Sequence, residues 1–467
     1  MLRPTKPRLH HYALLCAVAL AGWGCDGGSK APALSHTEEV VRQAPVPPEN
    51  GPKLGIVAEL ARVQEFTDVR APSIGVLRAG AKVARSAEPV SRSGCAGGWY
   101  AIRPRGFVCV GTEATLDLNH PTLAVMALQP NADAKLPYTY ARTRVETPVF
   151  ERSQAQEDAV REIGKLHRRA AMAVVGSWKA KEPSGSDARL ALLTDGHFIR
   201  ASDLEAAKGS DFSGVELGRN AELPIAFVVK RGVRSFQLNG NEAEKGDLVE
   251  YHSELLLSGR FRSLGSVKYW ELDSHAAPGG TAMATARRAA NELWVRHQDV
   301  TVVQKRSAFP DFVKDDTRWL DISASMGTLV AYEGKRAVFV TLLSIARELP
   351  ETAGATQPVS DGARGIPLGT FAVTHKGLTL LGKQPPGGFG EPFEVADAPW
   401  ALELSSGQVL HGAYWHDRFG IEHGAGTLEL SPSDAARIFH FVGPELPPGW
   451  HSIAVPANQG TPVVIRK

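Results

Sequence analysis

The sequence predicts a mainly β protein made of several modules, and three observations support this. Most of the chain alternates short apolar or β-branched runs with Gly or Pro, and no heptad repeat or long amphipathic helix stands out. The 46 glycines and 31 prolines favour turns and short strands over long helices. At about 100–200 residues per domain, a chain of 467 residues suggests two to four domains.

The composition excludes some classes of protein. Hydrophobic residues make up 43% and charged residues 22%, which rules out a mostly disordered chain. Lys+Arg minus Asp+Glu is 52 − 50 = +2, and three of the cations (Arg3, Lys6 and Arg8) lie at the extreme N-terminus. Because a nearly neutral chain has no overall electrostatic attraction for phosphates, we do not expect nucleic acid as a partner.

Residues 1–25 are predicted to form an export signal. A basic segment precedes the apolar stretch Tyr12–Ala21, which is too short for a membrane-spanning helix of about 20 residues. The following LAGWGC resembles a bacterial lipoprotein signal, which implies acylation of Cys25 and a membrane anchor. The alternative is a plain secretory signal. Either one predicts a location in the periplasm or cell envelope, and the Gly- and Pro-containing residues 26–55 read as a flexible tether.

Four cysteines are present, and their positions matter more than their number. Cys16 and Cys25 belong to the predicted signal, so Cys95 and Cys109 are the two left for folding. They bracket a strand, turn and strand pattern, and an oxidising compartment allows them to pair. We expect a disulfide here, which closes a short loop and contributes about 3 kcal/mol.

The N-terminal half shows a weak internal repetition. In residues 56–117, the segments GVLRAG and GWYAIRPRGFVC resemble a bacterial Src-homology-3-like (SH3-like) barrel, a module that often docks peptide stems of the cell wall. Residues 135–310 are predicted to be β-rich, with two weaker matches to that pattern in Thr147–Leu204 and Ala226–Val303. Each of these two segments ends in a strand of the form apolar-x-Arg followed by Asp. Two further barrels or one irregular β-region are the alternatives.

The C-terminal part of the chain carries four motifs in order: Trp319 to Gly334, Ile366 to Phe371, His411 to Gly420, and the helix start Leu430 to Phe439. On these motifs, residues 318–453 resemble the catalytic domain of the L,D-transpeptidases (YkuD-type fold). This resemblance implies a β-sandwich and a peptidoglycan acyltransferase, and we expect residues 454–467 to form a C-terminal tail.

The residues that carry the family's chemistry are missing from this sequence. The family uses a Cys thiolate as nucleophile and a His two residues upstream as base, within the motif S-H-G-C-V-N-L-S-P. Counting without gaps from either flank places the family's Ser on Gly424, its His on Ala425, its Gly on Gly426, its Cys on Thr427 and its Asn on Glu429.

Three hypotheses about function follow. Since no cysteine lies near this segment, we expect a catalytically inactive protein that binds the cell wall. The alternative is an active peptidoglycan L,D-transpeptidase that uses Thr427 or another group, and the Thr427 hydroxyl would need a well-placed base. A third hypothesis is an interaction scaffold that regulates a true transpeptidase through envelope protein partners.

The family pattern also predicts a binding surface for peptide stems. His411 matches the family's pocket histidine, Tyr414 and Trp415 offer aromatic walls, and Gly412 and Gly426 accompany them. The alternative is that this aromatic and histidine cluster only packs the interior.

No metal site or cofactor is predicted. His411, His416 and His423 lie close in sequence, but no carboxylate with suitable spacing and no H-E-x-x-H pattern accompany them.

Overall fold

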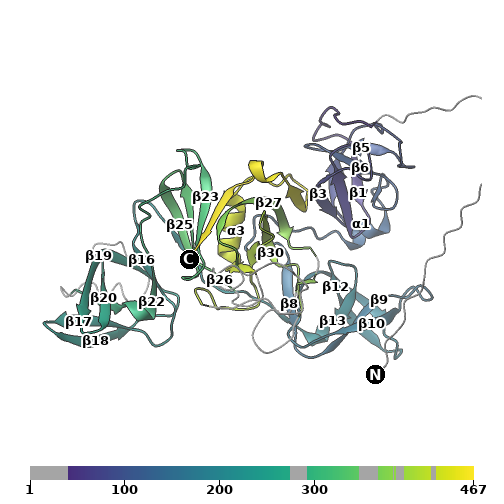
Figure 1. The fold of residues 1–467 in the computed structure, drawn as a ribbon. Coiled ribbons are helices and arrows are strands. Elements are labelled where there is room, and N and C mark those ends of the chain that lie inside the picture. Colours follow the sequence, from purple (N-terminus) through teal and green to yellow (C-terminus); the bar gives the residue numbers. More distant parts are fainter. Residues whose placement is uncertain (1–39, 274–291, 346–365, 382, 385–393, 422–426) are drawn as a thin grey trace, which may run out of the picture. The chain divides into compact units, whose positions relative to one another are not determined.

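The computed structural model describes residues 40–273, 292–345, 366–381, 383–384, 394–421 and 427–467. Their strands form four sheets, and the predicted mainly β fold is confirmed (Figure 1). No closed barrel occurs among these sheets. Glu39–Lys467 form one unit by contact, and no helix within the described part of the chain is long and apolar enough to cross a membrane.

The first β-module surrounds a small apolar core that includes Leu54, Val63 and Leu77. Its strands belong to two sheets, one in the order β4-β1-β7, while β2, β3, β5 and β6 join a larger sheet. The bounds are β1 Lys53–Ile56, β2 Leu60–Gln64, β3 Ser73–Arg78, β4 Lys82–Ala84, β5 Trp99–Ala101, β6 Phe107–Cys109 and β7 Ala114–Thr115, followed by the short helix α1 Pro121–Val125.

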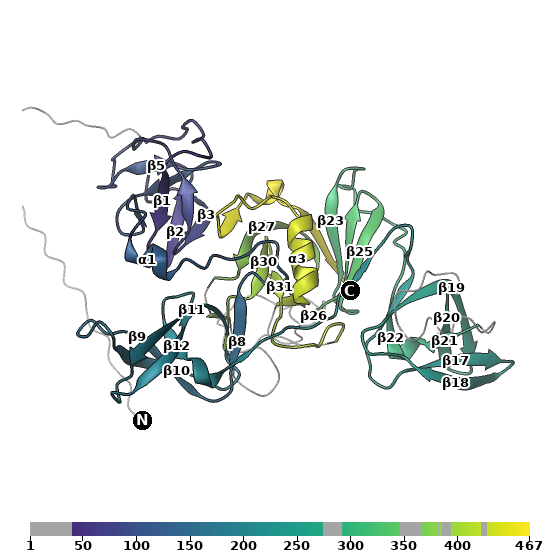
Figure 2. The ribbon, with the colours of Figure 1, turned by 180° about the vertical axis from the view of Figure 1, so that it is seen from behind.

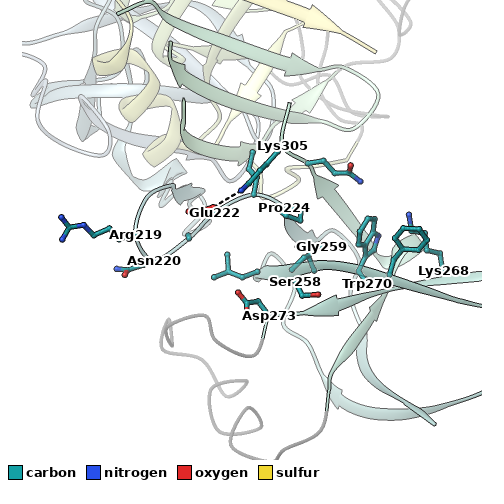
Figure 3. A pocket seen from close by; sticks show the side chains of 16 residues that line it. Arg219, Asn220, Glu222, Pro224, Ser258, Gly259, Lys268, Trp270, Asp273 and Lys305 are labelled. Carbon is teal, nitrogen blue, oxygen red and sulfur yellow. Dashed lines mark hydrogen bonds and ion pairs between the residues drawn. The ribbon is translucent and has the colours of Figure 1, made fainter. Parts of the chain in front are cut away.

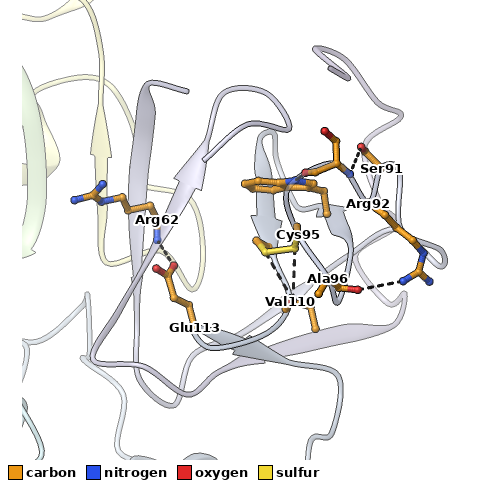
Figure 4. Close-up of a disulfide and its surroundings, with 10 residues drawn as sticks. Arg62, Ser91, Arg92, Cys95, Ala96, Val110 and Glu113 are labelled. Carbon is orange, nitrogen blue, oxygen red and sulfur yellow. Dashed lines mark hydrogen bonds between the residues drawn. A yellow bond between two sulfur atoms is a disulfide. The ribbon is translucent and has the colours of Figure 1, made fainter. Parts of the chain in front are cut away.

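The predicted disulfide is confirmed in this module. Cys95 and Cys109 are bonded with an S–S distance of 1.98 Å (Figure 4). Cys109 ends β6, which pairs with β5 so that Trp99 faces Cys109 across the hairpin. The bond therefore ties the loop before β5 to the end of the hairpin.

The middle region contains two separate sheets. The first holds β8 Thr139–Thr143, β9 Thr147–Arg152, β10 Val160–Leu166, β11 Ala171–Lys181, β12 Asp187–Leu193, β13 Phe198–Arg200 and β14 Leu204–Ala206, with the later short strands β28 Lys383–Gln384 and β29 Val395–Ala396. The second holds β16 Ile225–Val228, β17 Arg234–Asn239, β18 Glu242–Leu248, β19 Glu254–Leu264, β20 Val267–Leu272, β21 Trp294–Arg296 and β22 Val300–Val303.

The two weakly repeated segments, Thr147–Leu204 and Ala226–Val303, end in the same local structure. In the first, β13 is followed by a 3-10 turn over Ala201–Asp203 and then by β14. In the second, β21 is followed by a 3-10 turn over His297–Asp299 and then by β22. The shared ending agrees with the predicted repetition, while the identity of these modules as SH3-like barrels stays a prediction.

The C-terminal domain contains the longest helix of the described chain, α3 Pro432–Phe441. It begins where the sequence signals a start, because Ser431 caps its first turn by accepting from the Asp434 amide, and Pro432 occupies the first helical position. The helix packs on β30 and β31 (Figure 2).

The strands of this domain are β23 Arg318–Ser323, β24 Thr328–Glu333, β25 Arg336–Leu342, β26 Ser344–Ile345, β27 Gly369–Thr379, β30 Pro399–Leu404, β31 Val409–Gly412, β32 Leu428–Leu430, β33 Ser452–Ala454 and β34 Pro462–Arg466, and β15 Val215–Glu216 adds to the edge at β25. Strand β33 pairs with β3, so the first β-module and the C-terminal domain share a sheet.

Candidate functional site

Two parallel strands bring the predicted site residues together. Strand β31 carries His411, strand β32 carries Glu429, and the register places these two residues opposite each other. Thr427 lies immediately before β32 and is half-buried. Thr427, at the position that the resemblance assigns to the nucleophile, is therefore two residues before the strand partner of His411.

A buried carboxylate and histidine lie beside Thr427. Glu429 Oε2 lies 2.8 Å from His416 Nε2, and both side chains are less than 10% exposed. The Thr427 hydroxyl donates to the other oxygen, Glu429 Oε1, at 3.4 Å. The Glu429 carboxylate thus connects the His416 ring and the Thr427 hydroxyl in one hydrogen-bonded network.

The histidine and aromatic residues predicted to bind ligand are largely buried. His411 Nδ1 lies 3.2 Å from the Gly412 carbonyl, and burial lowers the pKa of His411 below its usual value, so the ring is neutral near pH 7. The Tyr414 hydroxyl donates to the Ala396 carbonyl at 3.0 Å, and its ring contacts that of Tyr140. His411, Gly412 and Tyr414 therefore pack the interior beneath the site.

Trp415 differs from them because it borders open space. It lines a cavity of about 570 Å³ that also includes His416, the partner of Glu429. Arg231, Tyr251 and Arg418 contribute to the same cavity, and Arg231 lies over the Tyr251 ring at 4.6 Å. The cavity thus combines aromatic surface with two exposed guanidinium groups and one carboxylate, Asp417. The two guanidinium groups outnumber that carboxylate, which suits a ligand with carboxylates.

The remaining predicted residues fall elsewhere. Ala425, Gly426 and Cys25 lie outside the described residues, as does His423. Sequence reasoning missed the pairing of His416 with Glu429. The signal was an acidic residue at the centre of Leu428–Leu430, a strand whose three residues are all buried, because a carboxylate enclosed in such a strand needs a partner.

A second cavity lies in the module of β16–β22. Its volume is about 950 Å³, and Phe261 is among the residues that line it. Lys268 and Trp270 lie at one part of its wall, while Glu222 pairs with Lys305 at another (Figure 3). The Lys268 ammonium lies 4.0 Å from the centre of the exposed Phe261 ring. This cation is therefore already engaged with an aromatic face.

Metal ligands do not gather anywhere in the described part of the chain. No group of three or more His, Cys, Asp or Glu side chains within those residues could hold a metal ion.

Comparisons with known proteins give distant structural neighbours. No family model and no curated protein sequence matches the chain. Among solved structures, a mutant L,D-transpeptidase from Enterococcus faecium aligns with 17% identity and a TM-score of 0.23, covering 35% of this chain and 55% of that one.

Two mycobacterial structures align similarly. An L,D-transpeptidase from Mycobacterium smegmatis has 13% identity and a TM-score of 0.22, covering 43% of this chain and 91% of that one. One from Mycobacterium tuberculosis has 16% identity and a TM-score of 0.21, covering 43% and 90%. The structural neighbours are thus L,D-transpeptidases at low identity, low TM-score and partial coverage.

Proposed function

We propose that this chain is an exported, peptidoglycan-binding envelope protein whose L,D-transpeptidase-like domain does not transfer acyl groups. One observation carries the proposal. Thr427 stands where the sequence pattern has its nucleophilic cysteine, and its hydroxyl is bonded to a carboxylate that already pairs with His416. The site thus holds a hydrogen-bonded network where the pattern requires a thiolate and its base.

The cysteine content supports the absence of thioester chemistry. The chain has four cysteines, of which Cys95 and Cys109 are bonded to each other in the first β-module. Cys16 and Cys25 belong to the predicted export signal. A hydroxyl is a much weaker nucleophile at neutral pH than a thiol, whose pKa of about 8.5 leaves some thiolate available.

The cavity beside the site supports binding of wall peptides. Peptide stems carry free carboxylates, and Arg231 and Arg418 offer guanidinium groups that pair with them. Trp415 and Tyr251 supply aromatic surface for the aliphatic parts of a stem. The cavity can therefore hold a stem without any acyl transfer.

A sacculus-binding assay tests this proposal. Purified protein should sediment with isolated sacculi, and Arg231→Ala should weaken the binding about three- to tenfold because one charge-assisted contact is lost. Arg231 is exposed, so the variant should fold. Arg336→Ala, which removes an exposed arginine at the start of β25 and away from the cavity, is the matched control and should bind like the native protein. Equal binding by both variants contradicts the assignment of the cavity.

The second candidate is an active transferase with Thr427 as nucleophile, and the contact between Thr427 and Glu429 favours it. In that reaction Glu429 takes the hydroxyl proton, Oγ1 bonds to the acyl carbon, and the amine of D-alanine leaves with a proton. Native protein incubated with tetrapeptide stems should release D-alanine under this candidate and none under the main proposal. Loss of any release in Thr427→Ala would identify Thr427 as nucleophile.

A gain-of-function variant separates a missing nucleophile from a missing pocket. The double change Ala425→His with Thr427→Cys restores the residue types at the family's spacing, and acylation by a carbapenem should appear in mass spectra. The native protein and Thr427→Ala should remain unmodified. Acylation of the native protein would overturn the proposal.

The proposal includes export and a lipid anchor at Cys25. Cys25→Ala should move the protein from the membrane fraction to the soluble fraction and change its gel mobility. An unchanged distribution would indicate an ordinary secretory signal. Envelope protein partners belong to the scaffold hypothesis, which crosslinking in cells followed by capture of a transpeptidase would support.

A further inference from the structure

A third cavity lies between the first β-module and the C-terminal domain, and it shares no lining residue with the cavity beside Thr427. Its volume is about 760 Å³. The titratable side chains that line it are Arg78, Lys82, Lys376, His440 and His451, with one acidic side chain, Glu445. Arg78 is paired with Asp397 and the His451 ring is neutral, so the two lysines outnumber the single carboxylate of Glu445. The cavity is therefore suited to an anion rather than a cation.

Lys376 is the central feature of this cavity. It lies in β27 and is 3% exposed, although it carries an ammonium group. Its Nζ donates to the Val442 carbonyl at 2.8 Å and lies 4.4 Å from the centre of the Phe439 ring. Within the described residues it forms no ion pair, and Glu445 acts on it only at longer range. Burial lowers the pKa of Lys376 to about 8.

A buried ammonium without a counter-ion is unfavourable, because desolvation of a charge costs several kcal/mol unless an opposite charge replaces the water. The hydrogen bond to Val442 uses one of three N–H donors. The other donors and the charge can be satisfied by a ligand that enters the cavity. This argument from charge alone indicates an anionic ligand.

Two further nitrogen atoms have unmet hydrogen-bonding capacity beside this cavity. Arg78 Nε and His451 Nδ1 are both buried and have no partner. Their side chains meet at Thr379, whose Oγ1 lies 3.3 Å from Arg78 Nη1 and 3.1 Å from His451 Nε2. Burial lowers the pKa of His451 to about 3, so the ring is neutral and its Nδ1 can accept a hydrogen bond.

We propose that this cavity binds the carboxylate end of an acylated amino acid or short peptide. The ligand carboxylate accepts from the Lys376 ammonium and from Arg78 Nε–H, and an amide N–H of the ligand donates to His451 Nδ1. Leu378, Phe439 and Trp450 line the same cavity and pack against the apolar part of the ligand. This site is separate from the proposed stem-binding cavity, and it does not depend on acyl transfer.

Calorimetric titration with a matched pair of ligands tests the carboxylate. N-acetyl-alanyl-alanine should bind, and the same dipeptide with a C-terminal amide should bind at least about tenfold more weakly, because the amide removes the charge that Lys376 requires. Equal affinities would overturn the proposal. Inorganic phosphate should compete poorly, and competition as strong as that of the dipeptide would indicate an unspecific anion site instead.

A pair of lysine variants tests the residue. Lys376→Met keeps the length of the side chain and removes the buried charge, so it should fold, which thermal unfolding checks, and lose about tenfold or more in affinity for the dipeptide. Lys335→Met removes an exposed lysine from a turn of the same domain and should bind like the native protein. Unchanged binding by Lys376→Met would refute the assignment.

The test of this carboxylate site can be distinguished from the test of the stem-binding cavity. Because the dipeptide carboxylate can also pair with Arg231 in the other cavity, the titration is repeated on Arg231→Ala, and Lys376→Met should lower the affinity by the same factor in that background. The effect of Lys376→Met is measured with the dipeptide and not with sacculi. Failure of one proposal therefore leaves the other standing.

Discussion

Arg78 and Lys376 line the same cavity from two different modules, but they differ in whether a buried counter-ion accompanies the charge. The Arg78 guanidinium forms an ion pair with Asp397, with Nη1 and Oδ1 2.6 Å apart and both side chains less than 10% exposed. Lys376 is equally buried but has no acidic partner of this kind among the described residues. The paired Arg78 links the modules and leaves only its Nε–H for a ligand, whereas the Lys376 ammonium still lacks a counter-ion.

The partners of Asp397 explain the architectural role. Its carboxylate also accepts from Thr194 at 2.6 Å and from Thr379 at 3.2 Å, and its backbone carbonyl accepts from the Tyr140 hydroxyl at 2.9 Å. Arg78 comes from the first β-module, Thr194 and Tyr140 from the middle region, and Thr379 from the C-terminal domain. A single carboxylate therefore links three regions of the chain.

Substitution of Asp397 should cause the largest loss of stability among these variants. Asp397→Asn removes the charge and leaves Arg78 buried without a counter-ion, which should lower the free energy of unfolding by about 3–5 kcal/mol. Asn tolerates the left-handed φ of +55° at this position, so backbone strain adds little. Urea unfolding measures the change.

The control is Asp158→Asn, which breaks an exposed ion pair with Lys181. It should cost far less than Asp397→Asn, because water screens an exposed ion pair. If both variants lose the same small amount, the central role assigned to Asp397 is wrong.

Lowering the pH should reduce the stability of the folded protein through His451, the residue that connects Thr379 to the cavity. Its pKa is about 3 in the folded state and 6.5 when unfolded, so the unfolded chain binds a proton over that range and the folded one does not. Stability should therefore fall as the pH drops from 6.5 towards 3, by up to about 4 kcal/mol. Unfolding curves at stepped pH measure this, and His451→Gln should remove that part of the slope. A slope equal to that of the native protein would contradict the buried neutral ring.

The disulfide provides a covalent reference within the first β-module. The double variant Cys95→Ala with Cys109→Ala should lose about 3 kcal/mol, because the short loop no longer restricts the unfolded chain. Thermal unfolding compares the two proteins, and mass spectrometry of the native one should find no free thiol at either residue. A native protein with both thiols free would exclude the bond.

The smallest stability effect should come from Lys376. Its pKa of about 8 in the folded state lies below the usual 10.5, so the unfolded chain keeps a proton between these values that the folded chain has released. Stability of the ligand-free protein should rise with pH from 8 to 10.5, and Lys376→Met should flatten that rise.

At pH 7 the same variant should be more stable by about 1–2 kcal/mol, since a buried charge is replaced by an apolar side chain. Lys335→Met, at an exposed turn, should show neither effect. A destabilised Lys376→Met would mean that the ammonium already has a partner, and the cavity would need no anion.

Local features of the fold were predictable from the sequence. Gly and Pro punctuation predicted a mainly β chain. The family resemblance placed a helix start within Leu430 to Phe439, and in the structure Ser431 caps α3 there. Cys95 and Cys109 could be paired because they are 14 residues apart and flank one hairpin. The site residues stay a prediction; the register of β31 and β32 places His411 opposite Glu429, which the sequence pattern aligned with the family's Asn.

The sequence by itself therefore determined the strand-rich character, the disulfide, the capped helix and the lack of a cysteine near the site. Only the tertiary structure decided which buried charges have partners. Arg78 and Asp397 are 319 residues apart, and His416 finds Glu429 through strand packing rather than through spacing. A periodic pattern reports which face of a strand is buried, but a buried charge is stabilised by atoms that any part of the chain can bring to it.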